Sequence, residues 1–366
     1  MDDRRRITLF HRIVLALILL AGLAGRLYRL DTVPDGFFCD EASLGYNAWA
    51  ILHYGIDETG ARLPLYATSL GVRKNPVFVY SSMLPIGVFG LSEWSVRLTS
   101  AVYGWLTILA LFWLMFELHG TLAGLLAALF MAVLPWNFHF SRIAFELITW
   151  PCLFTAGLAA FFRGLRKDGP IWLIAGLCMG LALHSYIMAM AFLPLFLPVL
   201  VIITTGKLVK HLRWPAAGAI LFCLLAIPAV MHQIQTRANF HYQAVSWWNR
   251  DAERPLAERL ETLKDHMIPF YTPEFLVDIG DPNPRHTLKK HGPIYESLFY
   301  LSIAGMILSL IPPRRYVWIL AAWTLFYPLG TAMTIDRYAT RSIIGSPLAP
   351  IWATLAIVQV YGWLSR

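Results

Sequence analysis

Long apolar runs separated by short polar turns follow one another along most of the chain. Ten of these runs are close to the length that a helix needs to cross a bilayer, roughly 17–25 residues. They cover Thr8 to Tyr28, Leu98 to Phe116, Leu122 to Phe138, Ile143 to Phe162, Ile171 to Tyr186, Met190 to Thr204, Trp214 to Met231, Ser297 to Ile311, Tyr316 to Met333 and Ile343 to Leu364. Within each run the apolar residues are consecutive rather than alternating, and lipid offers backbone polar groups no water. The pattern therefore predicts transmembrane helices and not strands.

The composition agrees with a membrane protein. Of the 366 residues, 57% are hydrophobic and only 14% are charged, with a mean hydropathy of +0.57. A soluble globular protein averages about half apolar and about a quarter charged residues. We expect an all-α polytopic membrane protein that forms a single transmembrane domain over residues 1–366. The first run follows Arg4-Arg5-Arg6, which leaves a cleaved secretory signal as an alternative, but the polytopic remainder favours a membrane span.

The segment Pro76 to Leu91 decides the topology, because its sixteen apolar residues are short for a span and suit the membrane interface. If it does not cross, three basic turns share the side of the N-terminus: Arg163/Arg166/Lys167, Lys207/Lys210/Arg213 and Arg314/Arg315. The positive-inside rule favours this arrangement, with both termini cytoplasmic in the inner (plasma) membrane. The turn Glu117 to Gly120 has no Lys or Arg and does not fit the rule. The net charge of +8 becomes an orientation signal, and a nucleic-acid surface is not expected.

This topology gathers the polar residues in four external loops, 29–96, 137–142, 233–295 and 336–341. Loops of about sixty residues are too long to be simple connections, so function is expected there. The middles of the spans are nearly free of ionisable groups, with His184 the main exception. A transporter of ions or protons normally carries such groups at mid-depth, so the pattern favours an interfacial catalyst.

Two adjacent carboxylates, Asp40 and Glu41, follow the first span, where they are wet enough to ionise and close enough to lipid to meet a lipid-borne substrate. Asp40 precedes an expected helix over Glu41 to His53, so a helix N-cap is its structural alternative. Neighbours on a helix diverge by about 100°, so both cannot face one substrate atom. We expect one of them to act as a base and the other to hold a metal or an arginine.

Further candidates lie at the starts of later elements. Lys74 stands beside Asn75 and a helix-starting Pro76, where it can reach a lipid phosphate or snorkel to headgroups. Glu146 is expected to face a polar cavity with Arg142 or a bound ion as its counter-charge, the alternative being an ion pair between two helices. Arg97 is a charged residue at the start of the second span. The stretch Gly55 to Tyr66 is interpreted as a solvated loop with satisfied charges.

The late loops add Arg285 and His286, which offer donors to an anion, and Asp336, Arg337 and Arg341. Singly, each of these is better explained as a surface charge, but their shared face favours a common site. Trp247 and Trp248 either stack on a sugar or anchor a loop at the interface, and anchoring is the preferred interpretation. The four cysteines stand apart without a CxxC motif, which indicates neither a disulfide framework nor a zinc site.

Taken in order, CDEASLGYNAWAIL, GIDETGARLPLY, KNPVFVY, GLSEWSVRL, FSRIAFE and RYATRSI resemble the membrane glycosyltransferases of the GT-C fold. The similarity is to the bacterial branch related to protein O-mannosyltransferases and lipid A aminoarabinose transferases (a glycosyltransferase family 39-like pattern). It runs from Leu30 to about Glu146 and more loosely to Arg341. The resemblance implies about ten transmembrane helices and juxtamembrane helices in the first external loop. Relatives often carry a C-terminal soluble domain, whereas this chain ends at Arg366 after its last span, so we expect acceptor recognition without one.

The resemblance also implies a polyprenyl-phosphate sugar as donor and an acid of the first loop that activates the acceptor, which is Asp40 here, with Glu41 beside it and Glu146 as second acid. We expect an inverting transfer to a hydroxyl of a glycan, lipid or protein, with the donor phosphate bound by Lys74, Arg97, Arg142, Arg285 and Arg341. Some relatives use a divalent metal, for which Glu41, Glu146 and His286 are the candidates here. The alternatives are a flippase or transporter of lipid-linked sugars and a non-catalytic membrane scaffold.

Overall fold

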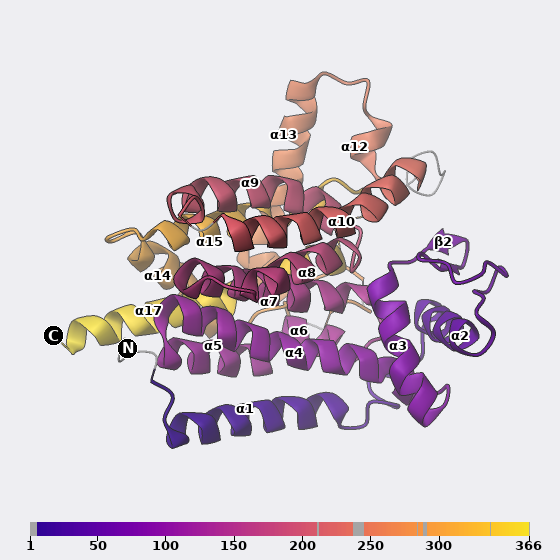
Figure 1. Cartoon of the computed structure of the whole chain (residues 1–366), viewed down its shortest axis with the longest axis horizontal. Coiled ribbons are helices and arrows are strands. Elements are labelled where there is room, and N and C mark those ends of the chain that lie inside the picture. Colours follow the sequence, from indigo (N-terminus) through magenta and orange to yellow (C-terminus); the bar gives the residue numbers. More distant parts are fainter. Residues whose placement is uncertain are drawn as a thin grey trace.

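The computed structural model describes residues 6–210, 212–236, 245–283, 285–287, 291–336 and 338–365. Each of the ten predicted runs contains a helix of a bundle (Figure 1), which confirms the all-α fold class. These helices are α1 (Leu9–Leu27), α4 (Glu93–His119), α5 (Thr121–Val133), α7 (Thr149–Lys167), α8 (Ile171–Leu183), α9 (Ala189–Leu208), α10 (Arg213–Thr236), α14 (Glu296–Ser309), α15 (Arg315–Phe326) and α17 (Leu348–Leu364). Within the described ranges, six segments are long and apolar enough to cross a membrane.

Glycines let the helices of this bundle approach one another closely. A Cβ atom on Gly305 of α14 would lie 1.8 Å from the carbonyl oxygen of Trp352 on α17. A Cβ atom on Gly176 of α8 would lie 2.0 Å from the carbonyl oxygen of Gly218 on α10. Such contacts are expected where lipid tails surround the helices, because association then depends on close packing and not on the hydrophobic effect.

Contacts at one end of the bundle bring the predicted basic turns together with the start of α1. The Thr121 hydroxyl donates to the Arg6 carbonyl over 3.4 Å, and His119 contacts Tyr316. The buried Glu117 carboxylate pairs with Arg163 at 3.3 Å and with Arg166. The turn Glu117 to Gly120, which has no Lys or Arg, therefore supplies the counter-charge for two arginines of the neighbouring basic turn.

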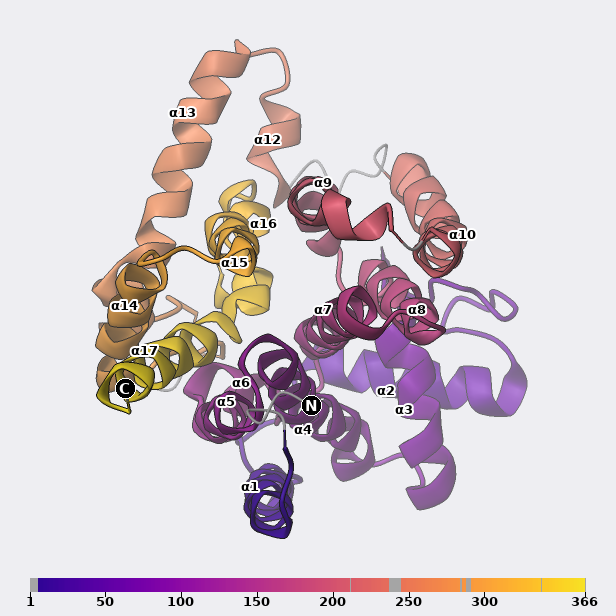
Figure 2. The same ribbon diagram turned by 60° about the vertical axis from the view of Figure 1, so that its left-hand side comes forward.

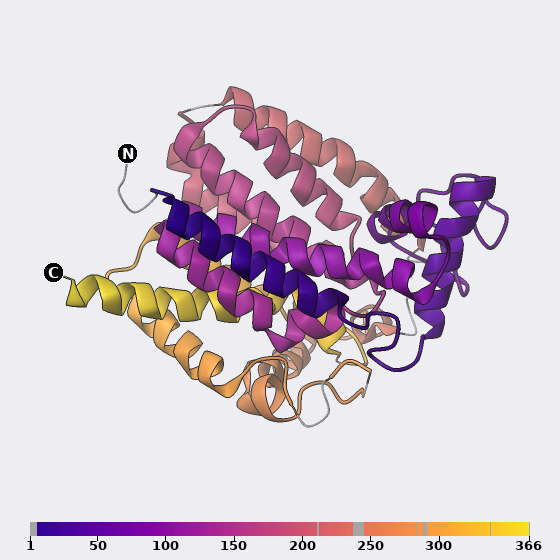
Figure 3. The same ribbon diagram turned by 90° about the horizontal axis from the view of Figure 1, so that it is seen from below.

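The opposite end of the bundle carries the first loop (Figures 1 and 3). It contains α2 (Cys39–Tyr54), the antiparallel strands β1 (Thr68–Ser69) and β2 (Val72–Arg73), and α3 (Pro76–Phe89). α3 begins after the N-cap Asn75, with Pro76 in its first turn, where a missing N–H costs nothing. It runs across the ends of the long helices in Figure 1 and not alongside them. α3 thus differs in direction from the long helices, and its place at the membrane surface stays a prediction.

The other loops at this end also contain short elements. α6 (Pro135–Phe140) and the 3-10 helix η2 (Glu146–Ile148) connect α5 to α7. The late loop contains α12 (Trp247–Arg250), α13 (Leu256–Met267), η3 (Ile268–Tyr271) and the single π-helical turn η4 (Glu274–Asp278). α16 (Leu329–Ala332) and η5 (Ala339–Gly345) flank the last turn. Figure 2 shows α12 and α13 extending away from the bundle.

Two acidic residues hold the first loop in shape. Asp57, only 2% exposed, accepts hydrogen bonds from the backbone N–H groups of Thr59 at 2.9 Å, Ala61 at 3.0 Å and Thr68 at 2.9 Å. Glu58 accepts from Ser43 of α2 at 2.7 Å and from the backbone of the hairpin turn. The charges of this stretch are satisfied, as expected, but Asp57 is buried and not solvated.

We expect Asp57→Asn to lower the free energy of unfolding by about 1.5–3 kcal/mol at neutral pH, the usual value of hydrogen bonds to a charged group. Burial alone would raise the pKa of Asp57, but hydrogen bonds from Thr68, Thr59 and Ala61 outweigh it and lower the pKa. The contribution is therefore fully present above about pH 4, the ordinary pKa of Asp, and is lost as pH falls through the lowered value. Unfolding in detergent at several pH values measures it.

The exposed Asp35 provides the matched control, because Asp35→Asn removes a carboxylate from the same loop without removing such contacts. The stability difference between the wild type and Asp57→Asn should shrink as the solution is acidified. A difference that is the same from neutral to acidic pH would contradict the role given to the carboxylate.

Candidate functional site

The two adjacent carboxylates occupy the first turn of α2. The helix begins at Cys39 with Phe38 as its N-cap, two residues earlier than predicted, so the interpretation of Asp40 as an N-cap is wrong. The Glu41 carboxylate instead accepts the Phe38 backbone N–H at 3.1 Å. The Asp40 side chain is 32% exposed, whereas the Glu41 side chain is 2% exposed. The two carboxylates thus differ in environment, as the helical geometry requires.

Glu41 is used to hold the protein together. Its oxygens accept Nε of Arg97 at 2.9 Å and Nη2 at 3.2 Å, and also the backbone N–H of Ala144 at 2.8 Å. Nη1 of Arg97 donates to the backbone carbonyls of Leu30 and Pro34, both at 3.2 Å, and Nη2 also donates to the carbonyl of Gly36. The expectation that one of the two acids holds an arginine is therefore met, and we assign both Glu41 and Arg97 structural roles in place of the catalytic and phosphate-binding roles.

Arg142 is likewise a structural residue. Its guanidinium donates to the carbonyls of Gly25 at 2.7 Å, Arg26 at 2.9 Å and Val33 at 2.9 Å. These carbonyls lie at the end of α1 and in the turn after it, where the helix leaves acceptors without partners. The predicted pairing of Arg142 with Glu146 is replaced by these contacts, and we propose a structural role for Arg142 in place of phosphate binding.

Glu146 pairs instead with the segment that precedes α3. Its two oxygens accept the backbone N–H of Asn75 at 2.9 Å and the Asn75 side-chain amide at 3.0 Å. The neighbouring Lys74 ammonium lies 2.9 Å from Asp40. Burial would lower the pKa of Lys74, but the charges of Glu146 and Asp40 outweigh burial and raise it, so Lys74 stays positively charged. One cation therefore serves two carboxylates that come from different parts of the chain.

A cavity of about 780 Å³ opens beside this cluster. Asp40, Lys74, Glu146, Arg285 and Arg341 all line it, whereas Glu41, Arg97 and Arg142 do not. Another part of its wall is apolar and comes from the ends of α8, α9 and α10, including Leu183, Ile187, Met188, Met190, Pro194 and Val230. The volume is in the range of about 300–1,000 Å³ that is typical of ligand sites. The cavity therefore suits a ligand that carries both a charged group and an apolar chain.

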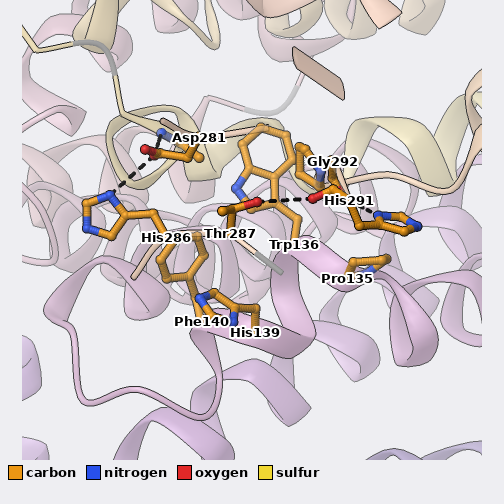
Figure 4. Close-up of a pocket in the computed structure, with 11 residues that line it drawn as sticks. Pro135, Trp136, His139, Phe140, Asp281, His286, Thr287, His291 and Gly292 are labelled. Atoms are coloured by element: carbon orange, nitrogen blue, oxygen red, sulfur yellow. Dashed lines mark hydrogen bonds and ion pairs between the residues drawn. The ribbon is translucent and has the colours of Figure 1, made fainter. Parts of the chain in front are cut away.

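The late loop is fixed above the cavity by a buried carboxylate. Asp281 accepts the backbone N–H of Asn283 at 2.8 Å and that of Ala339 on η5, and it lies 3.3 Å from His286. Figure 4 shows His286 directed toward Asp281, beside a pocket of only about 10 Å³. Such a volume holds about one water molecule, so this is a joint between two loops and not a substrate site.

Arg285 connects this joint to the first loop. Its guanidinium lies 3.7 Å from the centre of the Phe38 ring. Its carbonyl accepts from the ring of His139 at 2.9 Å, and burial lowers the pKa of that histidine, which keeps the ring neutral. Arg337, which the sequence also indicated, lies outside the described residues.

Three residues of the cavity wall were missed by sequence reasoning. Tyr186 lies beside Arg341 and Thr340 at the wall of the cavity, and its position in the turn after α8 gave no signal. Tyr66 donates to or accepts from Nδ1 of His184 over 2.8 Å and also lines the cavity. Arg73 is the last residue of β2 and also lines the cavity. Its position next to Lys74, a predicted phosphate ligand, was the only feature of the sequence that indicated it.

The candidates for a divalent metal do not come together. Glu146 is bound by Asn75, Glu41 by Arg97, and His286 by Asp281. Over the described ranges, no group of three His, Cys, Asp or Glu side chains is arranged to hold a metal ion. The residues named for this site therefore do not fit a metal, and the mechanism proposed below includes no step through one.

Comparison with known proteins identifies the fold. Residues 73–232 match the family of dolichyl-phosphate-mannose-protein mannosyltransferases, a range that includes Lys74 and Glu146 but not Asp40. No curated protein sequence matches the chain. Among solved structures, apo ArnT from Cupriavidus metallidurans is similar with a TM-score of 0.62 and 16% identity, covering 97% of this chain and 61% of ArnT. The chain thus spans about three fifths of the length of ArnT.

Two structures with bound lipids are similar to the same extent. ArnT bound to undecaprenyl phosphate gives a TM-score of 0.62 and 14% identity over 97% of this chain and 62% of that one. The archaeal oligosaccharyltransferase AglB from Archaeoglobus fulgidus, in complex with an inhibitory peptide and a dolichol-phosphate, gives 0.60 and 15% over 97% and 51%. The resemblance stated from the sequence is confirmed at the level of the fold: this chain has the GT-C membrane fold of ArnT and AglB, and the match to the mannosyltransferase family covers its residues 73–232.

Proposed function

We propose that the protein transfers a sugar from a polyprenyl-phosphate donor to an acceptor hydroxyl. The observation that carries the proposal is the cavity, which joins an ion cluster of Asp40, Lys74, Glu146 and Arg341 to an apolar wall. A prenyl phosphate has the same two parts. The two similar structures that contain undecaprenyl phosphate and dolichol-phosphate support this choice of ligand. The acceptor is a hydroxyl of a glycan, lipid or protein.

In the proposed reaction the carboxylate of Asp40 takes the proton of the acceptor hydroxyl. The acceptor oxygen forms a bond to the anomeric carbon while the bond from that carbon to the phosphate oxygen breaks on the opposite face. The transition state resembles an oxocarbenium ion, and the configuration is inverted. The prenyl phosphate departs as an anion and needs no proton, so one base is sufficient.

Cations then stabilise the charge that develops on the phosphate. Lys74, Arg285 and Arg341 are the proposed donors, because all three line the cavity. A phosphate would compete with Asp40 for the Lys74 ammonium. As the ammonium turns toward the phosphate, Asp40 gains the freedom to accept a proton. Glu146 is proposed as a positioning residue, since it fixes Asn75 and thereby Lys74.

The orientation follows from the charge of the turns. The basic turns after α7, α9 and α14 lie at the end opposite the cavity, so we propose that this end and both termini are cytoplasmic. The cavity then opens at the outer face of the inner membrane. This placement gives the site access to lipid-linked donors and to acceptors outside the cytoplasm.

The test is the binding of decaprenyl phosphate to the purified protein in nanodiscs, together with transfer from prenyl-phosphate sugars. We expect Lys74→Gln to weaken decaprenyl phosphate binding about 10- to 100-fold, because a hydrogen bond to a charged group contributes about 1.5–3 kcal/mol. Lys74→Arg, which keeps the charge, should recover part of the loss. Lys264→Gln on α13, where the lysine side chain is 63% exposed, is the matched control.

Equal affinity of the wild type and Lys74→Gln for decaprenyl phosphate would overturn the phosphate site. Translocation of donor across vesicles without any glycosyl transfer would instead favour a transporter of lipid-linked sugars.

A further inference from the structure

A second wall of the cavity is built by the late loop. Trp248 and Asn249 of α12 line the same cavity as Asp40 and Lys74. Figures 1 and 2 place α12 well away from α2 and α3, toward the side of the molecule where α13 extends. The cavity therefore reaches from the ion cluster to a part of the chain that the reaction proposed above does not use.

The two neighbouring tryptophans have different roles. Trp247 is buried, and its indole N–H donates to the carbonyl of Ala332 at 2.7 Å, which anchors α12 to α16. Trp248 is half-buried and lines the cavity. The preferred interpretation, in which both tryptophans anchor the loop at the membrane interface, stays a prediction, whereas the contacts of the two side chains within the protein differ.

Trp248 is held in a fixed orientation. The guanidinium of Arg259 on α13 lies 4.0 Å from the centre of its ring, and Nη2 of the same arginine donates to the Trp248 carbonyl at 2.8 Å. The backbone N–H of Trp248 contacts the carbonyl of Met333 at 3.4 Å. The Trp247 ring also packs against the Trp248 ring in a T-shaped arrangement, with the ring centroids 5.7 Å apart. The part of the ring that neither Arg259 nor Trp247 covers lines the cavity and remains for a ligand. A fixed aromatic ring costs little conformational entropy when a ligand binds.

Asn249 adds polar groups next to this ring. Its side-chain amide nitrogen donates to the Ser246 hydroxyl at 3.2 Å, which orients the amide. Within the part of the chain that the structure describes, the side-chain oxygen of Asn249 and the indole N–H of Trp248 make no hydrogen bond to protein, and neither is a buried atom without a partner. The wall thus offers an aromatic face, one donor and one acceptor, in a preformed arrangement.

We propose that Trp248 and Asn249 form a saccharide subsite of the cavity. A pyranose ring has an apolar face of C–H groups that packs on an aromatic ring, and hydroxyls at its edge that need donors and acceptors. An isoprenoid tail would cover both polar groups without offering them a hydrogen bond, which costs free energy. The proposal deepens the proposed function, because the saccharide is either the sugar of the donor or a sugar of the acceptor.

Binding measurements on the full chain in nanodiscs test this proposal without requiring turnover. The probes are decaprenyl phosphate, decaprenyl phosphates that bear mannose, glucose, galactose, N-acetylglucosamine or arabinose, and the methyl glycosides of the same sugars. We expect Trp248→Ala to weaken binding of the preferred sugar-bearing probe by about tenfold or more, and to change binding of decaprenyl phosphate by less than about twofold. Trp363→Ala, which removes a tryptophan that is 50% exposed on α17, is the control.

Asn249→Ala should weaken the same sugar-bearing probe without affecting decaprenyl phosphate. If Trp248→Ala fails to fold, the binding measured with Asn249→Ala tests the saccharide subsite in its place. A loss confined to the decaprenyl-phosphate sugars assigns the subsite to the donor, and a loss confined to methyl glycosides assigns it to the acceptor.

The proposal is overturned if no sugar-bearing probe depends on Trp248 or Asn249, or if the wild type gains no affinity from any sugar. It is also overturned if decaprenyl phosphate loses affinity by the same factor, because the effect would then be structural. These failures differ from the failure of the proposed function, in which Lys74→Gln leaves decaprenyl phosphate binding unchanged.

Discussion

Asp40→Asn is expected to reduce the rate of sugar transfer about 10²- to 10⁴-fold, the usual contribution of a general base. Asparagine has nearly the same shape, and its oxygen can still accept from the Lys74 ammonium, so the site should keep its geometry. It cannot take a proton from the acceptor hydroxyl. Decaprenyl phosphate should therefore bind at least as tightly as to the wild type, because the neutral amide competes less for the Lys74 ammonium, while the transfer rate falls. Initial rates with purified protein and a prenyl-phosphate sugar, beside binding of decaprenyl phosphate, separate the two effects.

Asp35→Asn is the appropriate comparison, because Asp35 is an exposed acid of the same loop. Its transfer rate should equal that of the wild type. Near wild-type transfer by a folded Asp40→Asn protein would exclude Asp40 as the base. A parallel loss of transfer and of decaprenyl phosphate binding would show that Asp40 acts by orienting Lys74.

The largest effect on stability is expected for Glu41→Ala. Removal of this carboxylate leaves the Arg97 guanidinium, which is 0% exposed, without its counter-charge. Breaking a buried pair in this way costs about 3–5 kcal/mol, because an uncompensated charge remains inside the protein. The loss of the contact from the Ala144 N–H adds to the effect. The free energy of unfolding in detergent, measured by a denaturant titration, gives the magnitude.

Glu93→Ala removes an exposed glutamate from the first turn of α4 and should change stability by about 0.5 kcal/mol or less. The comparison also separates the two roles considered for Glu41. If Glu41→Ala were as stable as the wild type but inactive in transfer, the structural assignment would be wrong and a role in catalysis would return.

Much of the membrane architecture can be predicted from run lengths and turn charges. The apolar runs become helices because lipid leaves the backbone no other partners. The position of Pro76 to Leu91 at the membrane surface and the cytoplasmic side of the basic turns stay predictions from the charge of the turns. In each case the governing property is local and additive along the chain, so it can be evaluated without knowledge of the fold.

The pairing of charges could not be predicted in the same way. Glu41 binds Arg97, 56 residues away, and Glu146 binds Asn75, 71 residues away. Sequence proximity suggested a pair between Arg142 and Glu146, but the free carbonyls at the end of α1 attract Arg142 instead. Partner choice depends on which acceptors the tertiary fold leaves unsatisfied, and no spacing rule contains that information. Tyr186 was not recognised for the same reason until the cavity was known, and the choice between the two roles considered for Trp248 also required the cavity.

Lys74 and Asn75 are consecutive residues, yet they contact carboxylates on two separate elements, Asp40 on α2 and Glu146 on η2. The distance between the Asp40 and Glu146 carboxylates is therefore set by the covalent length of the Lys74-Asn75 dipeptide and not by the packing of two helices. Successive side chains of an extended segment point to opposite sides. Insertion or deletion of a single residue between β2 and Pro76 would turn one of these two side chains to the opposite side, and its contact with Asp40 or Glu146 would be lost. A change of length in this segment is therefore expected to disturb the site more than the same change in a loop far from the cavity.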